Sequence, residues 1–256
     1  MLQITPQQLT PTIVSLFDIT KPTMPRAFNV LEGTASGQIF TDTLQNPTWA
    51  AVRDGAFGTL YFGGNVHAKL FTELLDHCRQ IGDTGFGCWL DDELNGMIPP
   101  NADYDGRTLY YTERTHQTDP KPGALPSGYI LAERDRALLK RSSEYQWNLE
   151  IFGNEDTILR ETMGVVILHG DEIVCEAGTG APTHGMIEIG VNTAESHRQR
   201  GLAFMACTQL IVQCEARGLR PWWDCAKQNT PSVQLAEKLG FVNKREYRYV
   251  WWKKSV

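Results

Sequence analysis

The clearest pattern in the chain lies in its second half, where helical and strand spacings of apolar residues follow one another. From Gly201 to Arg217, apolar residues recur every three or four positions, which predicts a helix with one buried face. A cation in the last turn and Gly218 directly after it are typical of a helix end. Short β-forming runs at Gly185–Asn192 and Pro221–Cys225 predict a strand on either side of this helix.

The same reasoning predicts further helices and strands along the chain. In the second half these are a strand at Gly128–Glu133, a largely helical segment at Asp135–Leu149, a hairpin of Gly164–His169 and Ile173–Ala177, a helix from an N-cap at Thr230 to Leu239, and a strand at Tyr247–Trp252. In the first half they are a strand at Thr59–Phe62, a helix at Ala68–Ile81 and a strand at Arg107–Tyr111. No repeat of about 20–50 residues is visible. The predicted class is therefore α/β, with a mixed (α+β) sheet.

One segment interrupts these patterns and suggests a domain boundary. Thr118–Gly128 contains three prolines and two glycines and has no apolar periodicity, which is typical of a linker or long loop. The chain of 256 residues is long enough for one large or two modest domains. We place the boundary near Pro126, with an α/β accessory lobe at 1–126 and a second domain at 127–256.

The charge distribution limits the classes of partner. The chain has 24 basic and 30 acidic residues, a net charge of −6, which disfavours nucleic acid as the main partner. Residues 1–125 hold 8 basic and 14 acidic residues, so the whole excess lies in the first half. The N-terminus lacks the basic and apolar runs of a signal peptide, and no apolar run approaches the ~20 residues of a membrane span. We expect a cytoplasmic protein with no membrane partner.

Metal and dinucleotide sites are disfavoured by residue spacing. The six cysteines form no C-x-x-C pair and no Cys/His cluster, so we expect reduced, mostly buried thiols and no metal. The glycine run Gly82–Gly87 neither follows a strand nor opens a helix, as a dinucleotide loop would require. Asp91, Asp92 and Glu93 could form a metal or amine site, although a solvated turn is the favoured interpretation.

The residues best suited to binding a ligand lie in the loop between the predicted strand Gly185–Asn192 and the long helix that follows it. A polar loop carries His197, Arg198 and Arg200, and the helix begins at Gly201. The first amides of a helix have no internal partner and lie at the positive end of the helix dipole, so they attract anions. Glycine allows a ligand to approach the backbone closely, and Ala203 keeps the first turn slim. This pattern predicts a pyrophosphate site.

The loop also carries a family resemblance. Arg-x-x-Gly-x-Ala between a strand and a helix resembles the acetyl-CoA loop of the GNAT (GCN5-related) N-acetyltransferases. A second motif, Asn-x-x-Ser-x-x-Leu-x-Glu-Lys-Leu-Gly-Phe at Asn229–Phe241, follows at the distance seen in that family. Together the motifs cover about 55–60 residues. The residues of these motifs, together with an N-terminal extension, are most similar to those of the subgroup that includes zwittermicin A resistance proteins.

The resemblance implies a GNAT acyl-CoA N-acyltransferase fold in the C-terminal half, with acetyl-CoA as co-substrate in a gap between two splayed strands. The residues that it places at acetyl-CoA are Val191, Asn192 and Thr193 along the pantetheine, Arg198, Gln199, Arg200, Gly201, Leu202 and Ala203 at the pyrophosphate, and Asn229 and Ser232 near the thioester. It implies direct attack of an amine on the thioester in a ternary complex. Glu188 is the first candidate for removing the amine proton, Asp224 is the second, and Asn229 lies beside the reacting atoms.

One position departs from the family pattern. Many GNAT proteins carry a tyrosine as the thiol's general acid where this chain has Ala236. Cys225, Ser232 or solvent water could take that role, or the thiolate could leave unprotonated. The expected acceptor is a small cationic amine, drawn by the negative first half of the chain. Two alternatives remain open, a non-catalytic acyl-CoA-binding or regulatory module and a protein or peptide N-acetyltransferase, and a homodimer is open as well.

Overall fold

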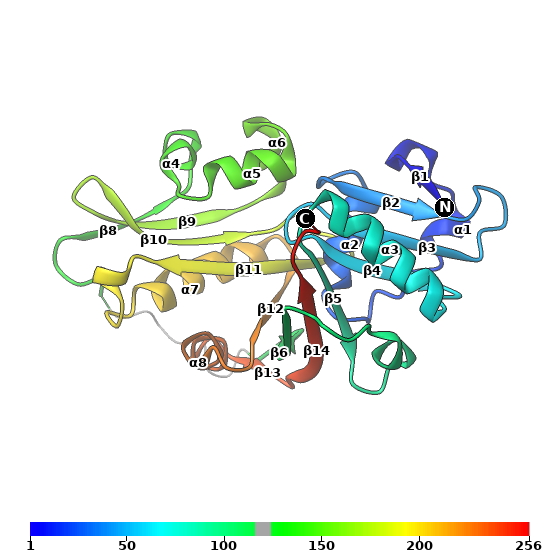
Figure 1. Ribbon diagram of the computed structural model, residues 1–256. Helices are drawn as coiled ribbons and strands as arrows, with labels where there is room; N and C mark the ends of the chain where they lie inside the picture. The colour runs from blue at the N-terminus through cyan, green and yellow to red at the C-terminus, as the bar shows by residue number, and fades with distance from the viewer. Residues whose placement is uncertain (116–123, 256) are drawn as a thin grey trace. The chain divides into compact units, whose positions relative to one another are not determined.

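The computed structural model describes residues 1–115 and 124–255 (Figure 1). The chain packs as two compact units, Met1–Leu109 with Glu246–Val256, and Tyr110–Arg245. The predicted linker Thr118–Gly128 lies mostly outside the described residues. The boundary predicted near Pro126 stays a prediction about the functional parts of the chain. The mixed α/β class predicted from the sequence is confirmed.

The first unit is a sheet with helices on both faces. Its elements are β1 (Leu2–Ile4), η1 (Pro6–Gln8), α1 (Pro11–Val14), α2 (Met24–Leu31), β2 (Gly37–Thr41), β3 (Trp49–Asp54), β4 (Thr59–Gly64), α3 (Ala68–Ile81), β5 (Thr84–Trp89), η2 (Glu93–Met97), most of β6 (Tyr104–Tyr111) and most of β14 (Arg245–Trp252). The strands lie in the order β1-β2-β3-β4-β5-β14-β6.

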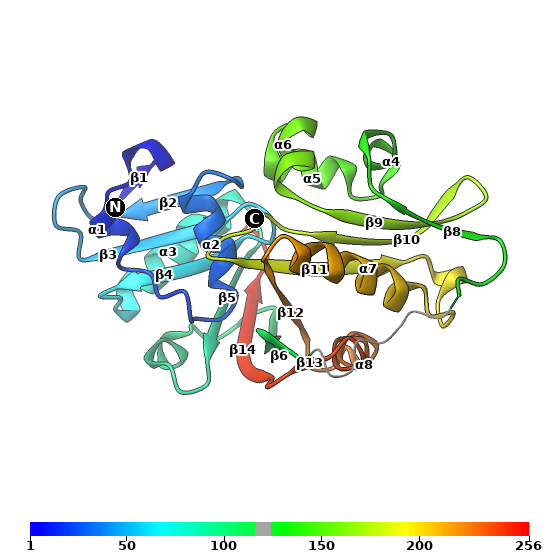
Figure 2. The same ribbon diagram turned by 180° about the vertical axis from the view of Figure 1, so that it is seen from behind.

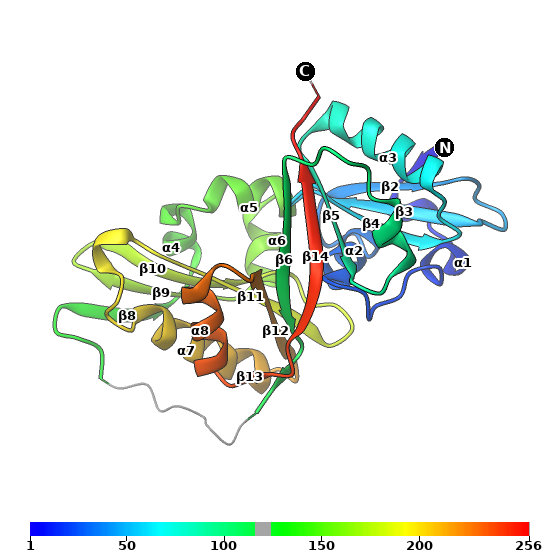
Figure 3. The same ribbon diagram turned by 60° about the horizontal axis from the view of Figure 1, so that its bottom comes forward.

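Alternating residues of the first unit's strands feed two separate cores. Ile39, Val52 and Tyr61 pack with α2 on one face. Their chain neighbours Phe40 and Phe62 pack with α3 on the other. This is the two-residue period of a strand with both faces covered. Figure 3 shows α3 along one side of these strands.

The second unit is also built on a mixed sheet. Its elements are β7 (Glu113–Arg114), β8 (Tyr129–Glu133), α4 (Arg136–Arg141), α5 (Tyr145–Phe152), α6 (Glu155–Glu161), β9 (Gly164–His169), β10 (Glu172–Thr179), β11 (Met186–Thr193), η3 (Glu195–His197), α7 (Leu202–Ala216), β12 (Arg220–Ala226), α8 (Thr230–Lys238) and β13 (Phe241–Val242). Five strands lie in the order β12-β11-β10-β9-β8, and β13 pairs with β7. Helix α7 packs on β9, β10 and β11, and α4 to α6 lie on the opposite side of these strands (Figure 2).

The two units repeat one order of elements. In each, a first strand is followed by short helices, three antiparallel neighbours, a long helix and a strand parallel to the preceding one. Helix α3 connects the parallel pair β4 and β5, as α7 connects β11 and β12. The repeat is therefore one of architecture, although the sequence shows no repeated motif.

Local patterns located the helices better than the breaks between them. The predicted helix Ala68–Ile81 is confirmed with these bounds, and α7 begins one residue after Gly201. The helical prediction over Asp135–Leu149 is only partly right, because Ser142 adopts extended angles (φ −63°, ψ 139°) and separates α4 from α5. The hydroxyl of Ser142 is bonded to a distant strand, which the local pattern does not reveal.

Candidate active site

The candidate site begins where β11 and β12 stop pairing. These parallel strands pair at Met186, Ile187 and Glu188, the last opposite Trp222. From Ile189 onward, β11 keeps its antiparallel partner β10 up to Thr193 but has no register position with β12. Backbone groups on the β12 side of that stretch are thus available to a ligand, at the carboxyl ends of two parallel strands, where ligands of open α/β sheets bind.

The loop after β11 delivers the chain to a helix end without a side-chain cap. Gln199 and Gly201 both adopt left-handed backbone angles, φ +60° and +78°, and Gly201 is the N-cap of α7. The N-cap Gly201 provides no side-chain cap for α7, whereas Asn154 and Asn229 cap α6 and α8. A Cβ added to Gly201 would meet nothing within 4 Å. The backbone at this helix end is therefore open on the side where Gly201 lacks a side chain, as an anion cradle requires.

Aromatic and imidazole rings anchor the start of this loop. The phenol oxygen of Tyr129 and Nδ1 of His197 lie 2.8 Å apart, within hydrogen-bond distance. The ring of His169 lies 4.8 Å from the Tyr129 ring and 5.2 Å from the His197 ring. The three residues come from β8, β9 and η3, so they tie the loop to two strands of the sheet. The sequence analysis identified only His197 here, as a source of positive charge.

The predicted pyrophosphate residues lie together around this helix end, with different exposures. Arg198, Gln199, Arg200 and Gly201 are exposed. Nε of Arg198 donates to the carbonyl of Thr193 at 3.1 Å, which folds that side chain toward the end of β11. Leu202 is only 1% exposed, so its side chain is buried and only its backbone amide could contact a ligand. The end of β11 that does not pair with β12 carries the other predicted contacts, Val191, Asn192 and Thr193, and Ala203 lies in the first turn of α7.

The two candidate bases lie on one face of the sheet. Residues in register on parallel strands point the same way, and side chains two residues apart share a face. Since Glu188 is opposite Trp222, Asp224 shares the face of Glu188 on the neighbouring strand. Both carboxylate residues are half-buried, whereas Ile187 and Ile189 are buried on the other face. A Cβ on Gly180 would lie 3.9 Å from Oε2 of Glu188.

The second motif forms the start of α8 and differs in one detail from the sequence prediction. The N-cap is Asn229, not Thr230, because Oδ1 of Asn229 accepts from the amide of Ser232 at 3.3 Å. Oγ of Ser232 in turn accepts from Nε1 of Trp223 at 3.1 Å. Burial raises the pKa of the Cys225 thiol, which makes it a weak proton donor. Ala236 is fully buried and offers no hydroxyl.

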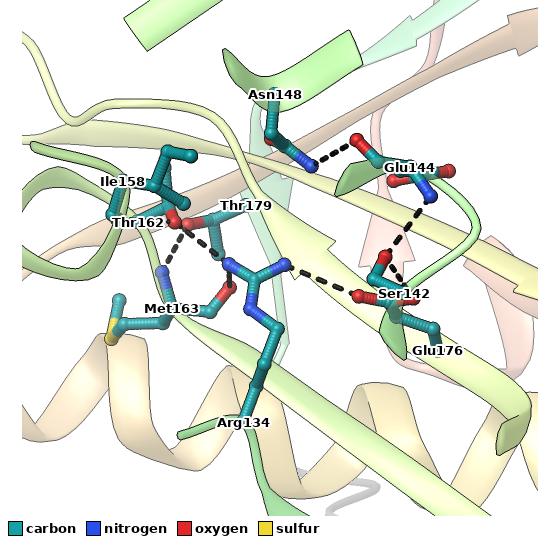
Figure 4. A network of polar contacts seen from close by, with 9 residues as sticks. All are labelled: Arg134, Ser142, Glu144, Asn148, Ile158, Thr162, Met163, Glu176 and Thr179. Carbon is teal, nitrogen blue, oxygen red and sulfur yellow. Dashed lines mark hydrogen bonds and ion pairs between the residues drawn. The ribbon is translucent and has the colours of Figure 1, made fainter. Parts of the chain in front are cut away.

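A buried network holds the strand beside the candidate base, and the sequence analysis did not find it. The guanidinium of Arg134 pairs with Glu176 of β10 at 3.3 Å, and the two side chains are 3% and 7% exposed (Figure 4). Nη2 of Arg134 also donates to Oγ1 of Thr162 at 2.7 Å. Oγ of Ser142 donates to the second carboxylate oxygen of Glu176 at 2.6 Å. One ion pair thus joins the strand neighbouring β11 to the turn between α4 and α5 and to the end of α6.

Removing one partner of this pair is expected to destabilise the protein strongly. Glu176→Leu leaves the Arg134 charge buried and should lower the free energy of unfolding by about 3–5 kcal/mol. The double variant Arg134→Met/Glu176→Leu should recover most of that loss, because no charge is then stranded. The matched control is Arg136→Ala, which removes an exposed arginine and should change the free energy of unfolding far less than Glu176→Leu does. Urea unfolding of the four proteins measures this, and equal losses for Glu176→Leu and Arg136→Ala would contradict it.

Cysteine and metal chemistry are limited in the part of the chain that the structure describes. All six cysteines are free and buried, as predicted. Burial raises the pKa of Cys175 to about 11. Within residues 1–115 and 124–255, no group of three His, Cys, Asp or Glu side chains could hold a metal ion. In the same ranges, no helix has both the length and the apolar character needed to cross a bilayer.

Comparison with known proteins agrees with this geometry. The family model described as GNAT acetyltransferase matches residues 16–250, which include both motifs, the second unit and most of the first unit. The chain belongs to the GNAT acetyltransferase family. The resemblance to that family, based on Arg198–Ala203 and Asn229–Phe241, is confirmed at the level of the family.

Individual GNAT relatives extend this result. The chain is 30% identical over 160 residues to YdfB, an uncharacterized N-acetyltransferase of Bacillus subtilis, covering 62% of this chain and 58% of that protein. It is similar to the crystal structure of a GCN5-related N-acetyltransferase-like protein from Streptococcus suis, with TM-score 0.70, 25% identity, and coverage of 97% and 100%. A tandem GNAT protein from the clavulanic acid biosynthesis pathway shares the fold, with TM-score 0.60, 12% identity, and coverage of 87% and 84%. The chain spans a little over half the length of the curated relatives that it matches.

Proposed function

We propose that this GNAT protein transfers the acetyl group of acetyl-CoA to the primary amine of a small cationic molecule. The amine nitrogen forms a bond to the acetyl carbonyl carbon, the carbon–sulfur bond breaks, the amine loses one proton, and the departing thiolate gains one. Acetyl-CoA supplies the activated acetyl group as a thioester. Every other contribution comes from residues of the chain and from solvent.

The observation that carries this proposal is the start of α7, which has no side-chain cap, following the end of β11, which does not pair with β12. The first-turn amides, the open space at Gly201 and the cations Arg198 and Arg200 fit a diphosphate. The free edge of β11 over 189–193 fits an extended arm with amide groups. The two features are continuous along the chain, as one extended coenzyme requires.

The proton that leaves the amine is assigned to Glu188. It lies at the last position where β11 pairs with β12 and shares a face with Asp224, which is the second candidate. Attack requires a neutral amine, so a half-buried carboxylate that accepts a proton, directly or through water, meets the chemical need. Asn229 and Ser232 order the start of α8 and lie near the thioester in this proposal.

The proton that the departing thiolate gains has more than one possible source. Ala236 carries no acid, and the raised pKa of Cys225 makes that thiol a poor donor. Ser232 or solvent water could supply the proton, or the thiolate could leave without it. Ala236, in place of the tyrosine of many GNAT proteins, favours one alternative function, a GNAT module that binds acyl-CoA without turnover.

A thiol-release assay over a broad panel of acceptors separates the alternatives. The panel contains polyamines, amine antibiotics and peptides with free lysine or N-terminal amines. We expect release with small cationic amines. Binding of acetyl-CoA without any release would favour the regulatory module, and release with peptides alone would favour a protein acetyltransferase. The predicted closeness to zwittermicin A resistance proteins is tested by including antibiotic amines.

We expect added salt to weaken binding of the acceptor amine. The negative charge of residues 1–125 attracts cations, and ionic strength screens that attraction over about 10 Å at 0.1 M. The acceptor KM should therefore rise several-fold between low salt and about 0.5 M salt, while the Kd of acetyl-CoA changes less. Steady-state kinetics at several salt concentrations measure both. An acceptor KM that does not respond to salt would exclude this attraction.

A further inference from the structure

The first unit has its own cavity at the carboxyl ends of its parallel strands. Strands β4 and β5 pair only at Thr59 and Leu60, opposite Gly85 and Phe86. Beyond that point lies a cavity of about 410 Å³, bounded by the end of β4, the segment after β5 and the loop between α1 and α2. This is the place in a mixed α/β sheet where ligands bind, and the volume suits a small molecule.

The cavity has an apolar part and an acidic part. The apolar part is formed by Leu16, Phe62, Val66, Leu94 and Met97. The acidic part is formed by Asp18, Asp91, Asp92 and Glu93, with Lys21 as the one cation of the lining. Four carboxylates against one ammonium leave a net charge of −3. A complementary ligand would be cationic and would carry an apolar chain.

The charges of this lining are held in place by local bonds. Lys21 pairs with Asp92, whose side chain is 8% exposed, so that pair is internally balanced. Asp18 accepts from the amide and the hydroxyl of Thr20 at 2.9 and 2.7 Å. Burial acts to raise the pKa of Asp18, but these bonds and the Lys21 charge hold it below its ordinary value. Asp91 and Glu93 are exposed at the cavity edge. Three carboxylates therefore remain to balance a ligand.

This cavity lacks the features that would admit a coenzyme diphosphate. Only three residues, 65–67, connect β4 to α3, whereas eight residues, 194–201, connect β11 to α7. Nδ1 of His67 accepts from the amide of Leu70 at 3.2 Å, so a side chain already occupies the start of α3. The lining is also opposite in charge to a phosphate site.

We propose that the cavity of the first unit is a second ligand site, which binds a small organic cation of the alkylamine class. The lining carboxylates bind the ammonium groups, and the apolar residues cover the alkyl chain. The turn of Asp91, Asp92 and Glu93, for which the sequence left open a solvated turn and a metal or amine site, is then part of a binding site. The proposal does not depend on the transferase function, because it concerns binding within the first unit alone.

Spermidine is the probe, and methionine methyl NMR of the full-length protein is the readout. Met97 lines the cavity, whereas Met163, Met186 and Met205 belong to the second unit. Spermidine should shift the Met97 methyl resonance, assigned with Met97→Leu, in a saturable way. Shifts confined to the second-unit methionines would place the amine elsewhere and overturn the proposal. The absence of any saturable Met97 shift up to about 10 mM spermidine would overturn it as well.

Two double variants of equal charge separate a site from general attraction. Asp91→Asn/Glu93→Gln should weaken spermidine binding about tenfold. The matched control, Glu73→Gln/Asp76→Asn, removes the same charge from exposed positions on α3 of the same unit and should leave binding within about twofold. Equal weakening by both would show charge attraction only and would overturn the site. Mg²⁺ is the second probe, and displacement of spermidine by equimolar Mg²⁺ would overturn the amine class in favour of a metal cation.

Discussion

Replacing Gly201 by valine is expected to abolish the binding of acetyl-CoA while the protein stays folded. Gly201 has φ +78°, where a β-branched residue is strained by about 1–2 kcal/mol. The space around its missing Cβ is empty, so the valine side chain would project from the N-cap of α7 into the space proposed for the diphosphate. Loss of two or three charge-assisted hydrogen bonds corresponds to a Kd increase of at least about 100-fold. Calorimetric titration with acetyl-CoA measures it.

The chain supplies a matched control for this substitution at the other end of the same helix. Gly218 has φ +72°, and a Cβ there would also meet nothing within 4 Å. Gly218→Val therefore introduces a similar backbone strain, measurable as a similar loss in urea unfolding, but leaves the start of α7 unchanged. Acetyl-CoA affinity should stay within about twofold of the parent in Gly218→Val. Equal affinity of the Gly201→Val protein and the parent would show that the diphosphate binds elsewhere.

Replacing Glu188 by glutamine is expected to lower kcat by about 10²–10⁴-fold without changing the Kd of acetyl-CoA. Glutamine keeps the size of the side chain and its ability to hydrogen-bond, but it cannot take the amine proton. The acid limb of the pH dependence of kcat/KM, which reports ionisation of the base, should change in this variant as well. A purely structural role for Glu188 would change stability and leave that limb in place.

The neighbouring carboxylates serve as controls for this second substitution. Glu172→Gln removes the same charge from an exposed position at the start of β10 and should leave kcat within about twofold. Asp224→Asn tests the second candidate base, which lies on the neighbouring strand β12. A large loss of kcat in Asp224→Asn together with a nearly unchanged Glu188→Gln protein would move the role of base to Asp224.

The first unit shows why local patterns missed several elements. Strand β3 (Trp49–Asp54) is buried at five of its six positions, so it lacks the alternation of a half-exposed strand. Helix α2 (Met24–Leu31) is buried at seven of its eight positions, and it spans too few turns for a helical period to repeat clearly. A strand covered on both faces has no alternating polar face for the sequence to reveal, and a helix this short gives only a weak signal. Helix α3, with one buried face, was predicted with its observed bounds.

The duplicated order of elements has a similar explanation. A fold is specified by the pattern of buried positions, and many unrelated side chains satisfy the same pattern. The two units thus share strand order and pairing directions, while their loops before α3 and α7 differ in length and chemistry. That difference distinguishes the proposed diphosphate site from the acidic cavity of the first unit. The relation between the two units is visible in their strand order and pairing directions, whereas their residue identities do not show it.

The sequence by itself determined the features that depend on neighbouring residues. Helix periodicity, Gly201 at the start of α7 and the adjacent arginines are local, because backbone angles and helix-end amides are set within a few positions. Only the tertiary structure decided which distant groups meet. The pairing of Arg134 with Glu176 spans 42 residues, and Glu188 shares a face with Asp224 only through the register of two strands. Such contacts arise from packing the whole sheet, since burial of a charge is stable only where its partner is brought to it.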